Sequence, residues 1–223
     1  MRFCASPNAR AQARRGAGHI AAILRQSVAA RGRASLAVPG GDTPGPLFDA
    51  LAHSAAPWPA LTVTLTDERW VAPADPASNE GQVRARLLQG RASAAAFLPL
   101  HNDAPTPEAG RRRAQAGLRP LLPLDVCVLG TGEDGHIASL FPGADLAARA
   151  PLLAVEAPGA RGAAARLSLS FRAIRTARTI FVLLRGHAKR RALAAHLAHN
   201  AALTPIQALI RNRRGGLWVL WAP

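Results

Sequence analysis

The chain has 223 residues and a mass of 23.3 kDa, a length that suits one large domain or two small ones. Hydrophobic residues make up 49% and charged residues 18%, a balance that excludes extended disorder, and no apolar run reaches the roughly 18 residues that a membrane-spanning helix needs. The formal net charge of +15 points to an anionic partner, which is a nucleic acid, a membrane surface or a small substrate. A GC-rich genome gives any protein the same bias toward arginine, so charge alone does not choose among them.

The first predicted element is an amphipathic helix over residues 8 to 31. Ile20, Ile23 and Leu24 fall on one face at spacings of three and four, which predicts that this helix packs on a core. The first 41 residues hold seven arginines and no acidic residue, which is also the composition of a mitochondrial transit peptide. The helix runs into the apolar segment Ala34 to Val38 without a linker, so we interpret it as structural.

Short strands and helices then alternate along the chain. The β-type runs are Ala34 to Val38, Leu61 to Leu65, Leu124 to Leu129, Leu152 to Val155, Arg166 to Ser170, Thr179 to Leu184 and Leu217 to Trp221. The helical stretches are Pro46 to Ala52, Asn79 to Gln89, Thr106 to Leu118 with Thr106 as N-cap, and His187 to His199. Strands separated by helices need crossover connections, so the sequence predicts an α/β fold: one domain over residues 1–223, with a mostly parallel sheet and helices on both faces.

Ligands of such sheets bind beyond the carboxyl ends of the strands, so the loop after Val38 is a candidate site. Gly40 and Gly41 let the backbone approach an anion, the next helix offers unpaired N–H groups, and Thr43 adds a hydroxyl. An ordinary Gly/Pro turn has the same composition. Asp42 must point away from a phosphate for the functional interpretation to hold.

Two cations follow other predicted strands. Arg69 lies just beyond Leu61 to Leu65 and can bind phosphate through paired hydrogen bonds, with Asp67 or Glu68 holding its guanidinium. The alternative is a surface ion pair. Lys189 comes shortly after the run that ends at Leu184 and can meet a phosphate or a sugar acid. The alternative is an ordinary lysine in the first turn of a helix, which the helix dipole mildly disfavours.

The segment Gly130 to Gly143 is the richest in chemistry. Its Gly-x-Gly-x-x-Gly pattern is formally a dinucleotide fingerprint, but Pro142 would end the required helix within two turns, and Glu133 and Asp134 would face the pyrophosphate. We therefore favour Asp134 and His136 as a carboxylate and an imidazole in a tight turn. The carboxylate fixes the imidazole tautomer, and the free nitrogen takes a proton from water. A structural histidine is the alternative.

Other chemistries lack their usual markers. The sequence has no Gly-x-Ser-x-Gly elbow, no P-loop and no His-Glu-x-x-His motif. His196 and His199 lie three apart in a predicted helix, but no third ligand accompanies them, so we expect no metal and no cofactor. Cys4 and Cys127 form no disulfide framework, which favours a reducing cytosol.

Several separated motifs together resemble the 6-phosphogluconolactonase family. They are Gly40-Gly41-Asp42-Thr43-Pro44, Asp67 to Val71 with Ser78-Asn79, Gly130 to Gly143, Gly186-x-x-Lys189 and the closing Trp221-Ala222-Pro223. The match covers residues 35 to 223 in order. The resemblance implies a Rossmann-like fold and a cytosolic enzyme that hydrolyses 6-phosphogluconolactone to 6-phosphogluconate, in the oxidative pentose phosphate pathway, without a metal.

The resemblance also implies roles for individual residues. His136 would deprotonate the attacking water, Asp134 would orient His136, and backbone N–H groups of the glycine loops would stabilise the oxyanion. The phosphosugar lactone would be held by the substrate-binding residues Gly40, Gly41, Thr43, Asp67, Arg69, Gly132, Arg166 and Lys189.

Two alternatives stay open on the sequence. Glucosamine-6-phosphate deaminases share the Asp-Gly-His loop, but Ala138 to Pro142 and Arg69-Trp70 make the lactonases the closer match. A basic module that binds nucleic acid would show salt-dependent affinity; we expect no specific nucleic-acid partner and no membrane partner. Asp42 and Asp75 depart from the usual family pattern, which puts the detail of substrate affinity in doubt, and the sequence leaves the oligomeric state open.

Overall fold

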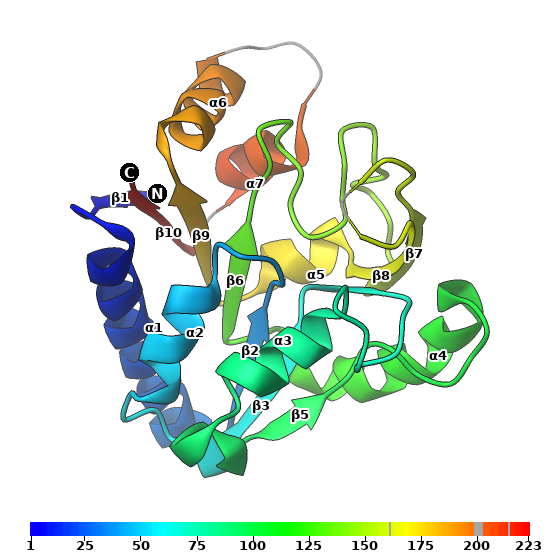
Figure 1. Ribbon diagram of the computed structural model, residues 1–223, viewed down its shortest axis with the longest axis horizontal. Coiled ribbons are helices and arrows are strands. Elements are labelled where there is room, and N and C mark those ends of the chain that lie inside the picture. The colour runs from blue at the N-terminus through cyan, green and yellow to red at the C-terminus, as the bar shows by residue number, and fades with distance from the viewer. Residues whose placement is uncertain (161, 199–202, 214) are drawn as a thin grey trace.

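The computed structural model describes residues 1–160, 162–198, 203–213 and 215–223 (Figure 1). The helices are α1 (Ala9–Arg31), α2 (Gly45–Ala52), α3 (Asn79–Arg86), α4 (Pro107–Leu118), α5 (Phe171–Thr176), α6 (His187–Ala198) and α7 (Pro205–Asn212). The strands are β1 (Arg2–Ala5), β2 (Ala34–Val38), β3 (Leu61–Leu65), β4 (Asp67–Arg69), β5 (Ala96–Leu98), β6 (Val126–Gly130), β7 (Leu152–Glu156), β8 (Ala165–Leu169), β9 (Thr179–Arg185) and β10 (Gly216–Ala222). This alternation confirms the predicted α/β class.

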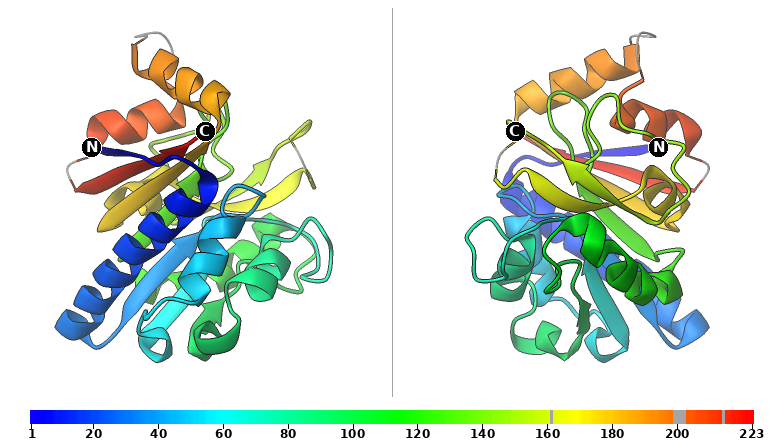
Figure 2. Two further views of the ribbon diagram at one scale, coloured as in Figure 1. Left: turned by 60° about the vertical axis from the view of Figure 1, so that its left-hand side comes forward. Right: turned by 90° about the vertical axis from the view of Figure 1, so that its right-hand side faces the viewer.

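The central sheet has seven strands in the order β1-β10-β9-β6-β2-β3-β5, and every neighbouring pair is parallel. The helices α1 and α2 lie on one face, and α5 and α7 lie on the other (Figures 1 and 2). Ile20 and Leu24 of α1 are completely buried, as their spacing predicts. The parallel sheet with helices on both faces is therefore confirmed.

A second, antiparallel sheet has the order β4-β8-β7. For β7 and β8 the expected place in the parallel sheet is wrong, because only the segment 157–164 joins these two strands. That connection is too short for a crossover helix, so the strands pair as a hairpin. The short strand β4 extends the hairpin and places Arg69 opposite Arg166.

The strand order reverses at β2, and this reversal positions the site. The chain moves from β2 to β3 and β5 on one side, and returns on the other side with β6, β9 and β10. The loops that leave the carboxyl ends of β2 and β6 therefore diverge and open a crevice between them. Open α/β sheets bind their ligands at such a reversal.

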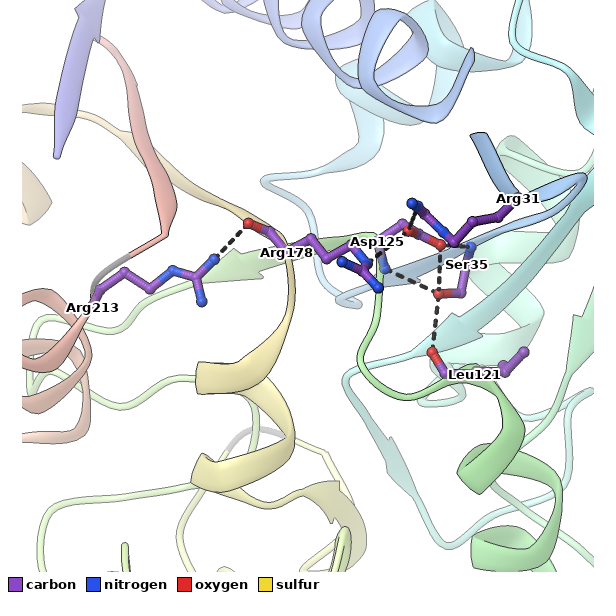
Figure 3. Close-up of polar contacts among 6 residues, drawn as sticks. All are labelled: Arg31, Ser35, Leu121, Asp125, Arg178 and Arg213. Atoms are coloured by element: carbon purple, nitrogen blue, oxygen red, sulfur yellow. Dashed lines mark hydrogen bonds and ion pairs between the residues drawn. The ribbon is translucent and has the colours of Figure 1, made fainter. Parts of the chain in front are cut away.

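Asp125 joins elements at the opposite end of the sheet (Figure 3). Its carboxylate accepts hydrogen bonds from the Ser35 backbone N–H (2.8 Å) and the Ser35 hydroxyl (3.3 Å), and it pairs with the guanidinium groups of Arg31 and Arg178. Arg213 donates to the carbonyl of Arg178 (2.8 Å). Two arginines compensate one buried carboxylate, so this cluster stabilises the amino ends of β2 and β6.

Some elements escape a search for apolar periodicity. The helix α7 begins with a capping box between Thr204 and Gln207, with Pro205 in its first turn, and has a strong local signal that the sequence analysis did not use. The prediction also omits α5, β1, β4 and β5, which are six residues or shorter. The helix predicted from Asn79 ends at Arg86, before Gln89, and His199 lies outside the described residues.

Candidate active site

The loops after β2, β3, β6 and β9 surround one cleft at the carboxyl edge of the sheet. The cleft has a smaller lobe of about 280 Å³ and a larger lobe of about 680 Å³. Four predicted site residues line both lobes: Arg69, Gly132, His136 and Arg166. The smaller lobe adds Gly40, Gly41, Thr43, Asp67 and Lys189, and the larger lobe adds Asp134. The fold thus brings together all ten residues that the sequence analysis selected.

Residues 132–136 form a tight turn directly after β6. The Gly135 N–H donates to the Gly132 carbonyl (3.2 Å), and the Gly132 N–H donates to the His136 carbonyl (3.3 Å). A β-carbon on Gly132 would lie 2.3 Å from Asp134 Oδ1 and 2.4 Å from His136 Nδ1, and Gly135 has a φ of +82°. Gly132 is required because the turn folds the Asp134 and His136 side chains back over the backbone, and Gly135 is required because its φ is left-handed.

The Asp134 carboxylate contacts the His136 ring. Asp134 Oδ1 lies 2.7 Å from His136 Nδ1 and also accepts a hydrogen bond from the His136 backbone N–H (3.2 Å). A carboxylate at Nδ1 holds the proton there and leaves Nε2 as an acceptor. The ring packs against Phe141, with centroids 4.9 Å apart, and remains partly exposed to the cleft. This geometry suits a general base acting on a water molecule.

Arg69 and Arg166 form a like-charge pair across the small sheet. They are opposed in the register of β4 and β8, so both side chains leave the same face toward the cleft. Burial, and then the positive charge of Arg69, lower the pKa of Arg166, while Asp67 raises it. Within the described chain, the Arg69 Nε is buried without a hydrogen-bond partner. Two guanidinium groups held together in this way favour an anionic ligand.

The glycine loop after β2 and the first turn of α6 complete the smaller lobe. The Gly41 N–H donates to Gln82 Oε1 (2.8 Å). Both this N–H and that of Gly132 are therefore already engaged, and neither serves as the expected oxyanion donor in this conformation. Lys189 lines the lobe from the opposite side, and the exposed Asp42 lines it as well.

The expected ion pair between Arg69 and Asp67 is wrong for the part of the chain that the structure describes. Asp67 Oδ2 accepts a hydrogen bond from the Ser139 hydroxyl (2.7 Å), and Oδ1 accepts one from the Thr66 hydroxyl (3.0 Å). The Ser139 N–H donates to the Ser168 hydroxyl (3.2 Å). Asp67 thus connects the small sheet to the loop that follows His136.

Glu68 does not pair with the Arg69 guanidinium either, because its carboxylate caps α3. It is completely buried and accepts four hydrogen bonds, from the N–H groups of Arg69 (2.7 Å), Asn79 (2.8 Å) and Glu80 (2.7 Å) and from the Ser78 hydroxyl (3.1 Å). Burial raises the pKa of Glu68 to about 7, although these donors oppose the rise. The sequence shows that residue 68 is acidic, but it does not predict that the carboxylate binds the N-terminal end of α3.

Comparison with known proteins supplies the family. A family described as glucosamine-6-phosphate isomerases/6-phosphogluconolactonase matches residues 7–221. The chain belongs to this family. The 6-phosphogluconolactonase of Caulobacter vibrioides is 41% identical over 206 residues, which cover 89% of this chain and 88% of that protein. The one from Rhizobium meliloti is 38% identical, with coverage of 100% and 98%.

A solved structure agrees with these relatives of the glucosamine-6-phosphate isomerase and 6-phosphogluconolactonase family. The crystal structure of a 6-phosphogluconolactonase from Shewanella baltica superposes with a TM-score of 0.95 at 37% identity, and the match covers 100% of this chain and 98% of that one. The resemblance inferred from the separated motifs is thereby confirmed, together with the fold that it implied.

The structure adds residues to which the sequence analysis gave no role. Phe141 packs on the His136 ring, and Ser139 joins the loop that follows His136 to Asp67. Asn79 is 1% exposed, and its Nδ2 donates to the Asp67 carbonyl (2.7 Å). These residues lie inside the motifs that carried the resemblance, so membership of those motifs was the feature of the sequence that could have identified them.

Two findings concern metals and membranes. Among the described residues, no three His, Cys, Asp or Glu side chains are grouped so that they could hold a metal ion. His199, the second member of the possible pair with His196, lies outside that part of the chain. No described helix combines the length and the apolar character needed to cross a membrane.

Proposed function

We propose that this cleft hydrolyses 6-phosphogluconolactone with His136 as the general base. The observation that carries the proposal is the position of the Asp134–His136 pair at the boundary of the two lobes, beside the opposed Arg69 and Arg166. A base next to a cationic pocket suits a neutral electrophile that carries a phosphate. The 6-phosphogluconolactonase names of the relatives agree with this chemistry.

The proposed reaction begins at the lactone carbonyl. His136 Nε2 takes a proton from water as the water oxygen bonds to the carbonyl carbon, and Asp134 stabilises the imidazolium that forms. The tetrahedral intermediate then collapses, the bond from the carbonyl carbon to the ring oxygen breaks, and the imidazolium returns its proton to that oxygen. The product is the open-chain acid, and His136 is again neutral.

The phosphate is placed in the smaller lobe. Arg69, Arg166 and Lys189 supply positive charge, and Thr43 with Gly40 and Gly41 supplies a polar wall on the β2 side. Charge-assisted hydrogen bonds to the phosphate fix the distance between the lactone ring and His136. Asp67 supports the loop that follows His136, and Gly132 allows the tight turn.

The remaining expectations belong to the same proposal. Residues 1–223 act as one domain, which is supported by a single hydrophobic cluster that includes Leu36 of the large sheet and Leu167 of the small sheet. A cytosolic location is supported by Cys4 and Cys127, which are both free and buried. We expect no specific nucleic-acid partner, because an anionic substrate accounts for the positive charge at the cleft.

The test is an assay of lactone disappearance corrected for spontaneous hydrolysis. The wild type should hydrolyse the phosphorylated lactone and should release no ammonia from glucosamine 6-phosphate, which separates the lactonase from a deaminase. A folded His136→Ala variant should lose about 10²- to 10⁴-fold in rate, since a general base contributes this much. A wild type without lactonase activity refutes the function, and a fully active His136→Ala variant refutes the role of the base.

A further inference from the structure

His196 lies outside the cleft but bonds to the catalytic turn. Its Nε2 is 2.8 Å from the backbone carbonyl of Glu133, the residue that precedes Asp134. His196 is half-buried on α6, and it follows Lys189 by seven positions, which is about two helical turns. Lys189 and His196 therefore lie on the same side of α6, one at the smaller lobe and the other at the turn.

The neighbouring helix α7 holds the other end of the same turn. The Ile206 N–H donates to the Gly135 carbonyl (3.0 Å), and the Thr204 side chain packs against Gly135. The carbonyls of Glu133 and Gly135 belong to the residues on either side of Asp134. The first carbonyl is thus held by α6 and the second by α7, and both helices lie beside the loop after β6 in Figure 1.

These two contacts define the position of Asp134. The exposed Asp134 side chain has hydrogen bonds only to the N–H and the Nδ1 of His136 in the described part of the chain. Its orientation therefore depends on the backbone to which it is attached. A rotation of the peptide at Glu133 would move the carboxylate away from Nδ1 and release the His136 ring.

We propose that His196 is a positioning residue for the reaction. By donating its Nε2–H to the Glu133 carbonyl, it holds Asp134 where Asp134 orients His136, and it connects the helix that carries Lys189 to the catalytic turn. This inference rests on the proposed function. The role of His196 is to donate a hydrogen bond, because a carbonyl oxygen can only accept one.

The weak packing of α6 makes this single bond significant. Among the described residues of α6, Leu193 is the one buried residue. A helix with little buried apolar surface opens at low cost, and polar contacts at its surface then contribute much of its attachment. Loss of the bond at His196 is therefore expected to loosen the turn without unfolding the sheet.

The experiment compares three substitutions of His196 in the full chain. His196→Ala and His196→Phe remove the donor, and His196→Gln keeps an N–H at a similar distance from the helix. We expect kcat to fall about 10-fold or more in the first two variants with little change in KM, since small displacements of a catalytic group cost this much. His196→Gln should recover most of the lost kcat.

His53→Ala is the matched control. His53 Nδ1 also contacts a backbone carbonyl, that of Asp49 at 2.7 Å, but this contact lies at the C-terminal end of α2 and away from the cleft. The control should keep wild-type kcat and KM. Lys189→Ala should instead raise KM, because Lys189 is assigned to the phosphate.

The outcomes separate this inference from the proposed function. If the wild type hydrolyses the lactone and the folded Ala and Phe variants keep its kcat, the inference is refuted while the function stands. If Ala, Phe and Gln all lose kcat equally, the hydrogen bond is not the cause and the inference is again refuted. If the wild type has no lactonase activity, the proposed function fails first.

Discussion

Glu68 gives a quantitative test of how burial and hydrogen bonding compete in this protein. Burial raises the pKa of its carboxyl group from 4.5 to about 7, against four hydrogen-bond donors that favour the ionised form. Between pH 4.5 and 7 the unfolded chain has lost the proton and the folded chain has kept it. Stability therefore falls as the pH rises through this window. A pKa difference of this size corresponds to about 3 kcal/mol of unfolding free energy.

The perturbation is Glu68→Gln, which keeps the shape of the side chain and cannot titrate. Denaturant unfolding of both proteins from pH 4.5 to 7.5 gives the free energy of unfolding at each pH. We expect the wild type to lose about 3 kcal/mol relative to Glu68→Gln across this range, whatever the offset between the two proteins at the start. The two proteins differ only at residue 68, so the difference between their pH profiles isolates Glu68.

A difference that stays constant from pH 4.5 to 7.5 would refute this reasoning. It would mean that the N–H groups of Arg69, Asn79 and Glu80 and the Ser78 hydroxyl outweigh burial, and that Glu68 is ionised throughout. Glu68 also contributes to the site, because its carboxylate binds the backbone N–H groups of Arg69 and of Asn79 at the start of α3.

Three further predictions follow from the site. Arg69→Ala and Lys189→Ala should lower kcat/KM at least 10-fold for the phosphorylated lactone and little for an unphosphorylated one, because each variant loses a charge-assisted contact of about 1.5 to 3 kcal/mol. Ala138 has a φ of +49°, so Ala138→Gly should raise the free energy of unfolding by up to about 1 kcal/mol in denaturant titrations. Despite the net charge of +15, nucleic-acid binding should be weak, independent of sequence and absent at physiological salt in a filter-binding assay.

Each of these has a contradicting result. Equal losses of kcat/KM on both lactones would show that neither Arg69 nor Lys189 binds the phosphate. A less stable Ala138→Gly variant would show that contacts of the methyl group outweigh backbone strain. Tight binding of one nucleic-acid sequence at physiological salt, without lactonase activity, would favour the basic binding module over the enzyme.

The sequence was most informative where the chemistry is local. Asp134 and His136 are two positions apart in a glycine turn, so their contact follows from the turn itself. The carboxyl-edge loops were also predictable, since parallel strands send their ends to one side of a sheet. The order of the strands, in which β2 lies between β6 and β3, then brings Gly40 and Arg69 near His136.

Contacts between distant segments were beyond local reasoning. Strand β4 has three residues, two of them acidic and one basic, and no pattern of alternation that marks a strand. Its pairing with β8 is what places Arg69 opposite Arg166. Likewise Glu68 looked like a partner for Arg69 because the two are adjacent, whereas its carboxylate reaches the start of α3, whose position depends on the intervening loop.

The opposed arginines lead to one more prediction, which links stability to ligand binding. Like charges directly across an antiparallel pair are destabilising, so the Arg69–Arg166 register costs the free protein some stability. An anion between the two guanidinium groups removes this cost. Inorganic phosphate at ten times its Kd should add about 1.4 kcal/mol to the unfolding free energy and raise Tm by about 4 °C, measured against chloride at equal ionic strength. Arg166→Gln should abolish this increment, while Arg113→Gln on the exposed face of α4 should keep it. If the Arg166 variant gains as much as the wild type, phosphate binds elsewhere and the pair has another function.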